Sequence, residues 1–293
     1  MKSSKAIFFA VLAAALYALM TPVSKLMQIS VPPVMEAGLL YLGAGIGMTV
    51  IYFSEKCLGR KQLRPSIQRE DLKHVIMMVV LDIAAPIFLM LGLSMSSPES
   101  VSLLNNFEIV ATAVIASVYF KEKISGRLAL SIGVITLSCI LLSVDEGADF
   151  SLSRGSLFVI LACICWGLEN NCTSSISDKD TRQIVIIKGL GSGAASFVIS
   201  LAVGEKLCSV TDMIIIMVLG FFAIGLGVYL YVIAQSVIGA ARTSSYYAVS
   251  PFIGVLLSLV IFREIPGMLF WTALLIMAIG VYLNVMDVKK QSC

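Results

Sequence analysis

Charged residues are scarce in this chain of 293 residues. They make up 13% of the sequence, against about 25% in a typical soluble domain, and hydrophobic residues make up 58%. The single histidine, His74, leaves no histidine pair for catalysis or for a metal site. This composition argues against a soluble enzyme and directs attention to the hydrophobic segments.

Catalytic and cofactor motifs are also missing. The seven cysteines include no CxxC spacing and no cluster with histidine, so we expect free thiols rather than disulfides or a metal centre. The glycine run at 189–193 is neither a nucleophile elbow nor a dinucleotide loop, because no strand–helix unit surrounds it. We therefore expect no cofactor, no metal and no enzymatic activity. We expect no sizeable soluble domain, and therefore neither a receptor that signals through such a domain nor a nucleic-acid-binding protein.

Long hydrophobic runs are abundant, and each is close to the length of about 20 residues that a helix needs to cross a bilayer. Continuous runs such as 6–19 lack the alternation of a barrel strand. The sequence therefore predicts an all-α membrane protein with ten transmembrane helices. The expected spans are 6–23, 33–53, 74–94, 98–119, 126–144, 155–175, 182–204, 211–231, 240–262 and 267–287.

The basic residues predict how these helices are oriented. If the N-terminus is cytoplasmic, 17 of the 21 Lys and Arg fall on the inner side, six of them in the loop at 56–73. The other four are Lys25, Arg154, Lys206 and Arg263. Because short loops rich in Lys and Arg stay inside, we expect an inner-membrane protein with both termini cytoplasmic. The first apolar run has no evident cleavage site and is interpreted as a retained helix.

The two halves of the chain repeat short patterns. Phe-Lys-Glu at 120–122 recurs as Phe-Arg-Glu at 262–264, and Gly-x-Gly-x-Gly at 43–47 recurs at 189–193. Chance alignment of apolar helices is the alternative explanation. We favour two five-helix units, 1–145 and 146–293. Because five is odd, the second unit would be inserted upside down, as in many transporters.

At these residues the chain resembles the drug/metabolite transporter superfamily, in particular its ten-helix EamA-type branch. Glu108 matches the first glutamate of the family's two Glu-Pro pairs, although Ile109 replaces the proline. Pro251 matches the second proline, although Ser250 replaces the glutamate. The resemblance implies a central cavity formed by helices 1, 3, 4, 6, 8 and 9, with helices 5 and 10 peripheral. It also implies export of amino acids or other small metabolites.

Glu108 is the first candidate for the transport pathway. A charge at the bilayer centre costs at least about 2.5–3.5 kcal/mol on insertion scales, so a charged residue there indicates a structural or functional role. Asn105 and Thr112 share its helix face. This polar face predicts contact with a cavity, while a helix-packing hydrogen bond is the alternative.

Glu169 is the second candidate, with Trp166, Asn170 and Thr173 beside it at helical spacing. The tryptophan ring can stabilise a cation, and the carboxylate can bind an amine or carry a proton. Alternatively, Glu169 lies shallow enough to reach the headgroups.

Other polar residues extend this set. Asp82 lies one turn before Pro86 and could pair with Lys188, although we favour a Lys188 side chain that extends to the inner interface. Tyr17, Tyr246 and Tyr247 are either pathway or packing aromatics. The predicted pathway residues are Tyr17, Asp82, Asn105, Glu108, Trp166, Glu169, Asn170, Tyr246, Tyr247 and Ser250.

These features together predict a transporter for a small polar metabolite, an amino acid or organic amine, that works by alternating access and exports its substrate. The alternatives are an uncoupled facilitator or channel for the same solutes, and a multidrug exporter. The expected partners are the solute, protons as a candidate co-substrate, and the lipid bilayer. The expected oligomeric state is a monomer or a homodimer.

Overall fold

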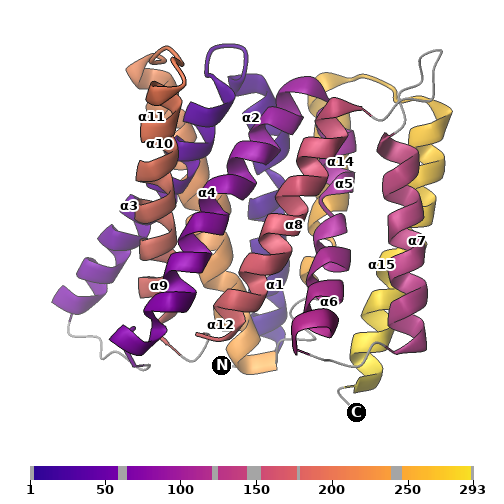
Figure 1. Cartoon of the computed structure of the whole chain (residues 1–293), viewed down its shortest axis with the longest axis horizontal. Helices are drawn as coiled ribbons and strands as arrows, with labels where there is room; N and C mark the ends of the chain where they lie inside the picture. The colour runs from indigo at the N-terminus through magenta and orange to yellow at the C-terminus, as the bar shows by residue number, and fades with distance from the viewer. Residues whose placement is uncertain are drawn as a thin grey trace.

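The computed structural model describes residues 3–58, 65–120, 125–143, 153–176, 179–238 and 246–291, and this part of the chain is helical without strands (Figure 1). Eight helical stretches in it are long and apolar enough to cross a membrane. This result supports the predicted all-α membrane fold without fixing the number of spans at ten.

The helices follow one another along the chain with short connections. The first half contains α1 (Ser3–Ala18), α2 (Met20–Met27), α3 (Pro33–Cys57), α4 (Leu72–Met95), α5 (Pro98–Leu104), α6 (Phe107–Phe120) and α7 (Gly126–Ser143). The second half contains α8 (Arg154–Ser174), α9 (Thr181–Ile187), α10 (Gly193–Ala202), α11 (Val210–Gly220), α12 (Gly227–Ile238), α14 (Ser250–Phe262) and α15 (Met268–Gln291). The π-helical segment η2 (Lys188–Ser192) joins α9 to α10, and η3 (Phe221–Leu226) joins α11 to α12.

The expected spans at 98–119 and 240–262 differ from uninterrupted helices. The span at 98–119 is divided into α5 and α6 at Asn105–Asn106, where the Asn106 Nδ2 donates to Leu103 O at 3.1 Å. Asparagine side chains compete for backbone groups in this way and weaken a helix. The span at 240–262 contains the short helix α14, and its first residues, 240–245, lie outside the described residues.

The helices are interrupted near one proline and continue through another. The helix α4 continues through Pro86 without a break. The first span is divided instead at Leu19, between α1 and α2, shortly before Pro22. Two spans, α1–α2 and α5–α6, are therefore interrupted inside the bundle.

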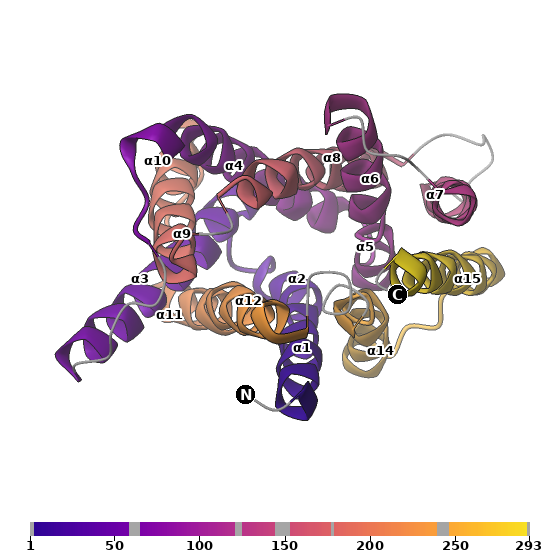
Figure 2. The ribbon, with the colours of Figure 1, turned by 90° about the horizontal axis from the view of Figure 1, so that it is seen from below.

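The two halves pack against each other in a reciprocal way (Figure 2). The helix α4 lies along α8, and α1 lies along α12. Likewise α6 packs on α8, and α14 packs on α1. The contact of the third expected span with the sixth thus corresponds to that of the eighth with the first. In the same way, the contact of the fourth span with the sixth corresponds to that of the ninth with the first.

The helices α7 and α15 form a pair at one edge of the bundle, as the family resemblance implies (Figure 2). Two buried serines join them: Ser131 Oγ donates to Gly280 O at 2.8 Å, and Ser138 Oγ donates to Ala273 O at 2.7 Å. This pair leaves the other helices to form the interior.

Glycines allow α3 and η2 to lie in close contact. A Cβ atom on Gly189 would lie 2.4 Å from Gly45 Cα, and one on Gly45 would lie 2.5 Å from Leu190 N. A Cβ on Gly191, two residues from Gly189, would meet only the Val79 side chain, at 3.3 Å. Small residues allow such backbone contacts in membranes.

This difference gives a matched pair of variants. Gly189→Ala is expected to lower stability by about 1–3 kcal/mol, because backbone must move to admit the methyl group. Gly191→Ala is expected to be neutral or slightly stabilising, because alanine favours the helix. Thermal unfolding of the purified variants compares them directly, and equal melting temperatures would contradict the packing described here.

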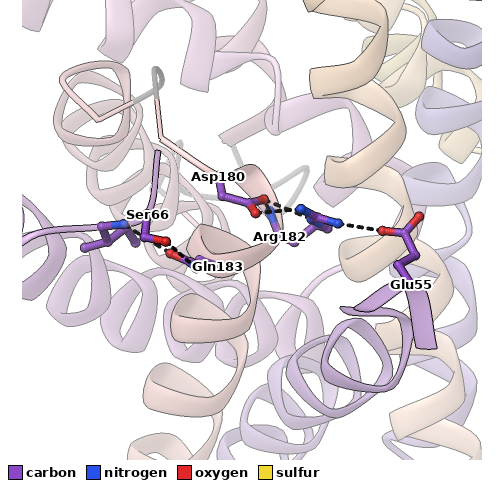
Figure 3. A network of polar contacts seen from close by, with 6 residues as sticks. Glu55, Ser66, Asp180, Arg182 and Gln183 are labelled. Atoms are coloured by element: carbon purple, nitrogen blue, oxygen red, sulfur yellow. Dashed lines mark hydrogen bonds and ion pairs between the residues drawn. The ribbon is translucent and has the colours of Figure 1, made fainter. Parts of the chain in front are cut away.

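The start of α1 and the end of α15 lie at the same end of the bundle, which we call the terminal end; the opposite end is the far end (Figure 1). At the terminal end, Arg182 joins the two halves. Its guanidinium group pairs with Glu55 at 2.7 Å and with Asp180 at 2.7 Å, and it stacks over the Tyr52 ring (Figure 3).

A neighbouring residue extends this contact. Gln183 Oε1 accepts from Ile67 N at 3.1 Å, and Gln183 Nε2 donates to Ser66 Oγ at 3.2 Å (Figure 3). The chain leading into α4 is thereby held against the start of α9. Both halves of the protein contribute residues to this network, so it closes their interface at the terminal end.

Candidate functional site

A buried ion cluster lies inside the bundle. Lys188 Nζ lies 2.8 Å from Glu169 Oε1 and 3.2 Å from Asp82 Oδ2. Glu169 is 2% exposed and Asp82 is fully buried. The prediction that Lys188 extends to the inner interface is therefore wrong. An unpaired buried carboxylate is costly, and Lys188 compensates two of them at once.

Two hydroxyl groups complete this cluster. Tyr41 Oη donates to Asp82 Oδ1 at 3.2 Å, and the Thr173 hydroxyl donates to Glu169 Oε1. Tyr41 comes from α3, Asp82 from α4, Glu169 from α8 and Lys188 from η2. The cluster thus joins two helices of each half, and with all groups ionised it carries one more negative than positive charge.

The local backbone explains how Lys188 reaches this position. It begins η2, a π-helical turn between two α-helices, and such turns are frequent at functional sites. The glycines that follow let α3 approach η2 closely. Tyr41 and Gly45 are one turn apart on α3, so the helix face that meets η2 also presents the tyrosine.

A second polar contact joins the halves beside this cluster. Asn170 Nδ2 donates to Glu108 Oε1 at 2.6 Å, and both side chains are half-buried. Glu108 lies within electrostatic range of Glu169 and Lys188. The two predicted acids thus belong to one neighbourhood. The Glu108 contact is also the helix-packing hydrogen bond that was the alternative interpretation.

Asn105 lies at the junction of α5 and α6, close in sequence to Glu108. Its Oδ1 is buried and has no hydrogen-bond partner in the described part of the chain. On the neighbouring helix, Asn171 Nδ2 donates to Gly167 O at 2.8 Å and to Thr112 O at 3.3 Å. Two amide groups of α8, those of Asn170 and Asn171, therefore bond to the divided span.

Three tyrosine rings form an aromatic group near the acids. The ring of Tyr247 lies 5.9 Å from that of Tyr17 and 5.1 Å from that of Tyr231. Tyr17 lies within electrostatic range of Glu108 and Asp82. The sequence analysis named Tyr17 and Tyr247 but missed Tyr231.

The remaining predicted residues differ in their surroundings. Trp166 is 8% exposed and lies beside Tyr41 in the hydrophobic core, so it borders the polar cluster. Ser250 Oγ donates to Ala14 O at 2.8 Å, which joins α14 to α1. Tyr246 is 37% exposed. Ser250 thus has a clear packing role.

Within the described residues, no group of three His, Cys, Asp or Glu side chains could hold a metal ion. Cys139 and Cys163 are buried free thiols in that part of the chain. Polar and ionic contacts, with aromatic rings, therefore supply the chemistry of the cluster.

Comparison with known proteins identifies the family of this chain. Residues 4–144 and 153–286 each match the EamA-like transporter family. The chain belongs to this family. The match confirms the resemblance to the drug/metabolite transporter superfamily, and it makes this EamA-like protein a multi-pass membrane protein with a two-repeat architecture.

Individual relatives agree with this assignment. An uncharacterized transporter of Methanothermobacter thermautotrophicus is 25% identical over 276 residues, which cover 88% of this chain and 80% of the relative. The uncharacterized transporter YyaM of Bacillus subtilis is 20% identical over 226 residues, which cover 74% and 72%. A crystal structure with 14% identity superposes with a TM-score of 0.71, covers 99% of this chain and 98% of its own, and supports the fold alone.

Proposed function

We propose that this EamA-like protein carries a small polar solute, an amino acid or an organic amine, across the cell membrane by alternating access, and that it exports this solute. The observation that carries the proposal is the cluster of Asp82, Glu169 and Lys188, which is buried between the two halves. Ionisable residues at membrane depth are costly and commonly mark a transport pathway.

The charges of the cluster favour a substrate that contains an amino group. A substrate ammonium group can replace Lys188 at Glu169, and a substrate carboxylate can then pair with the released Lys188. A zwitterion satisfies both requirements at once. The nearby rings of Tyr17 and Tyr247 offer faces that stabilise a cation. A proton on a carboxylate is the alternative occupant of the same site.

The proposed mechanism is a rocking motion of two inverted units, residues 1–145 and 146–293. The reciprocal packing of α4 on α8 and α1 on α12 supports this symmetry, since equivalent helices exchange partners. Substrate sites of inverted-repeat transporters lie near the midplane between the units. The cluster joins helices of both units, so a relative motion would change its access.

We also propose that the terminal end is cytoplasmic. With ten spans, 17 of the 21 basic residues fall on the same side of the membrane as the N-terminus, and loops rich in basic residues stay inside. Single cysteines placed at 147–152 should react with a membrane-impermeant reagent on intact cells, and those placed at 58–66 should not. These sites lie largely outside the described residues. Reaction of the second set alone would reverse the orientation.

A facilitator or channel for the same solutes, and a multidrug exporter, are the alternative functions. Transport assays in liposomes separate them. A carrier should saturate with substrate and should show counterflow, whereas a channel should show neither. A multidrug exporter should accept large apolar cations in place of amino acids.

A further inference from the structure

The short helix α2 lies at the far end of the bundle, beside the end of α4 (Figure 1). Two long polar side chains, one in the last turn of α2 and one directly after it, bond to α4. Lys25 Nζ donates to Leu93 O at 2.6 Å and to Ser96 O at 2.8 Å. Gln28 Nε2 donates to Met90 O at 3.0 Å. Three carbonyl groups at or near the end of α4 therefore hold α2 in place.

The chemistry of the Lys25 contact allows it to break and form again. The last carbonyl groups of a helix have no partner within the helix, and a cation is favourable there. Lys25 is only partly buried, and its charged neighbours are Glu99 and Glu264. Because a lysine side chain is long and flexible, its ammonium group can leave the carbonyl groups and stay near water and these acids.

The backbone before α2 permits this helix to move. The first span is interrupted at Leu19, and Pro22 follows in the first turn of α2. Proline has no N–H group, so Ala18 O lacks the donor that a continuous helix would place four residues further on. Residues at the ends of such elements can act as hinges, because a few dihedral angles absorb the movement.

The helix α4 is packed against α8 in a different way at the same end. A Cβ atom on Gly92 of α4 would lie 2.9 Å from Gly155 O of α8, and one on Gly155 would lie 3.0 Å from Gly92 O. These two backbones are in direct contact, which small residues allow in membranes. We therefore expect α4 to stay with α8 when α2 separates from α4.

The contact between α2 and α4 also joins the two sides of the candidate site. The acids Asp82 and Glu169 belong to α4 and α8. The rings of Tyr17 and Tyr231, which both contact the ring of Tyr247, belong to α1 and α12. Since α2 continues from α1, its separation from α4 would open a route from the far end to the space between the aromatic group and the acids.

The helix α3 offers α2 a second polar partner. Glu36 is fully buried in the first turn of α3, and Ser24 and Gln28 lie beside it as side chains that can form hydrogen bonds to its carboxyl group. The Gln28 amide thus has one acceptor on α4, Met90 O, and another within reach on α3. If α2 leaves α4, Gln28 still has a partner.

We propose that α2 is the gate at the far end of the transport pathway, and that Lys25 and Gln28 hold this gate closed against α4. In the open state α2 tilts at Leu19, Lys25 releases the carbonyl groups of α4, and Gln28 passes to Glu36. The inference rests on the proposed carrier function, because a gate has a role only in a protein that moves a solute.

The first test needs no solute. Ser24 is fully buried behind the closed gate, so the thiol of Ser24→Cys should react slowly with a maleimide in nanodiscs. Peptide mass mapping measures the reaction at this residue. Adding Lys25→Met should raise the rate by roughly tenfold or more, because a charge-assisted contact of the closed state is lost.

Lys206→Met is the control for the loss of a positive charge. Lys206 is exposed between α10 and α11, also at the far end (Figure 1). In the Ser24→Cys background it should leave the reaction rate unchanged. If Lys25→Met does not fold, Gln28→Leu removes the other bond to α4 and should also raise the rate. Unchanged rates in the folded gate variants overturn the proposal.

The second test distinguishes a gate from a static contact. Lys25→Cys with Ser96→Cys is linked by a short bis-methanethiosulfonate, which a reductant removes. The linked protein should lose counterflow in liposomes and regain it after reduction, because α2 must leave α4 in each cycle. Ser138→Cys with Ala273→Cys is the control, since Ser138 Oγ donates to Ala273 O between the peripheral helices α7 and α15. Linkage there should leave counterflow unchanged.

The two tests fail in different ways. Equal counterflow by the linked and the reduced forms of Lys25→Cys with Ser96→Cys overturns the gate and leaves the carrier function intact. Absence of counterflow in the wild type with amino acids and aliphatic diamines counts against the proposed function. The reaction rates of Ser24→Cys do not depend on a solute, so they report the opening of α2 in either case.

Discussion

Lys188→Met is expected to abolish transport and to destabilise the protein by about 3–5 kcal/mol, because it leaves two buried carboxylates without a counter-charge. Methionine keeps the length of the side chain, so the charge is the main change. Asp82 and Glu169 would then face each other's charge with only the Tyr41 and Thr173 hydroxyl groups as partners. Thermal unfolding and uptake into liposomes measure the two effects.

The double variant Lys188→Met with Asp82→Asn removes one of the two unpaired charges. It should regain part of the lost stability and none of the transport. Lys179→Met is the control, since Lys179 pairs at 3.5 Å with Asp71, whose side chain is 14% exposed whereas that of Asp82 is fully buried. That variant should lose about 1 kcal/mol or less. Equal stability losses for Lys188→Met and Lys179→Met would contradict the buried cluster.

Glu169→Gln is expected to slow transport by roughly ten- to a hundredfold and to flatten its pH dependence. The variant keeps the shape of the side chain but loses a charge-assisted contact, worth about 1.5–3 kcal/mol. In the wild type, an amine is attracted only by carboxylate groups that are ionised, so its uptake is expected to depend on pH. Uptake measured across a pH series compares the two profiles.

Thr173→Val is the control for this change. It removes the hydrogen bond to Glu169 but keeps the charge, so the pH profile should retain its shape. If Glu169→Gln transports at the rate of the wild type with an unchanged profile, Glu108 becomes the leading acid. If Glu108→Gln is also without effect, a neutral-substrate facilitator is the better account.

The sequence predicted the membrane fold well, because long apolar runs have few other stable forms. It predicted less well where helices are divided. The junction at Asn105–Asn106 lies inside an apolar run, and its two adjacent asparagines were the available signal. Proline interrupts helices more strongly than asparagine does, yet α4 continues through Pro86.

The structure brings the predicted acids together and shows partners that the sequence did not reveal. Asp82 and Glu169 meet through Lys188, and Glu108 meets Asn170, but helical spacing on one segment cannot reveal contacts between segments. The position of Lys188 agrees with the need of the buried acids for a counter-charge. The length of its side chain had suggested extension to the inner interface. Two further residues, Tyr41 and Glu36, were missed.

Both missed residues had a signal in the sequence. Tyr41 shares a helix face with Gly45, which marks the face that meets another helix. Glu36 is an acid inside the expected span 33–53, and it met the same criterion that selected Asp82. A count of all acids at membrane depth would have included it.

The most direct test of the central claim, a carrier with its site at the buried ion cluster, is counterflow in liposomes. The probes are radiolabelled amino acids and aliphatic diamines, chosen by their stabilisation of the purified protein. The wild type should accumulate label transiently against unlabelled solute inside, and the double variant Lys188→Met with Asp82→Asn should not. Equal counterflow by that folded double variant would contradict the account.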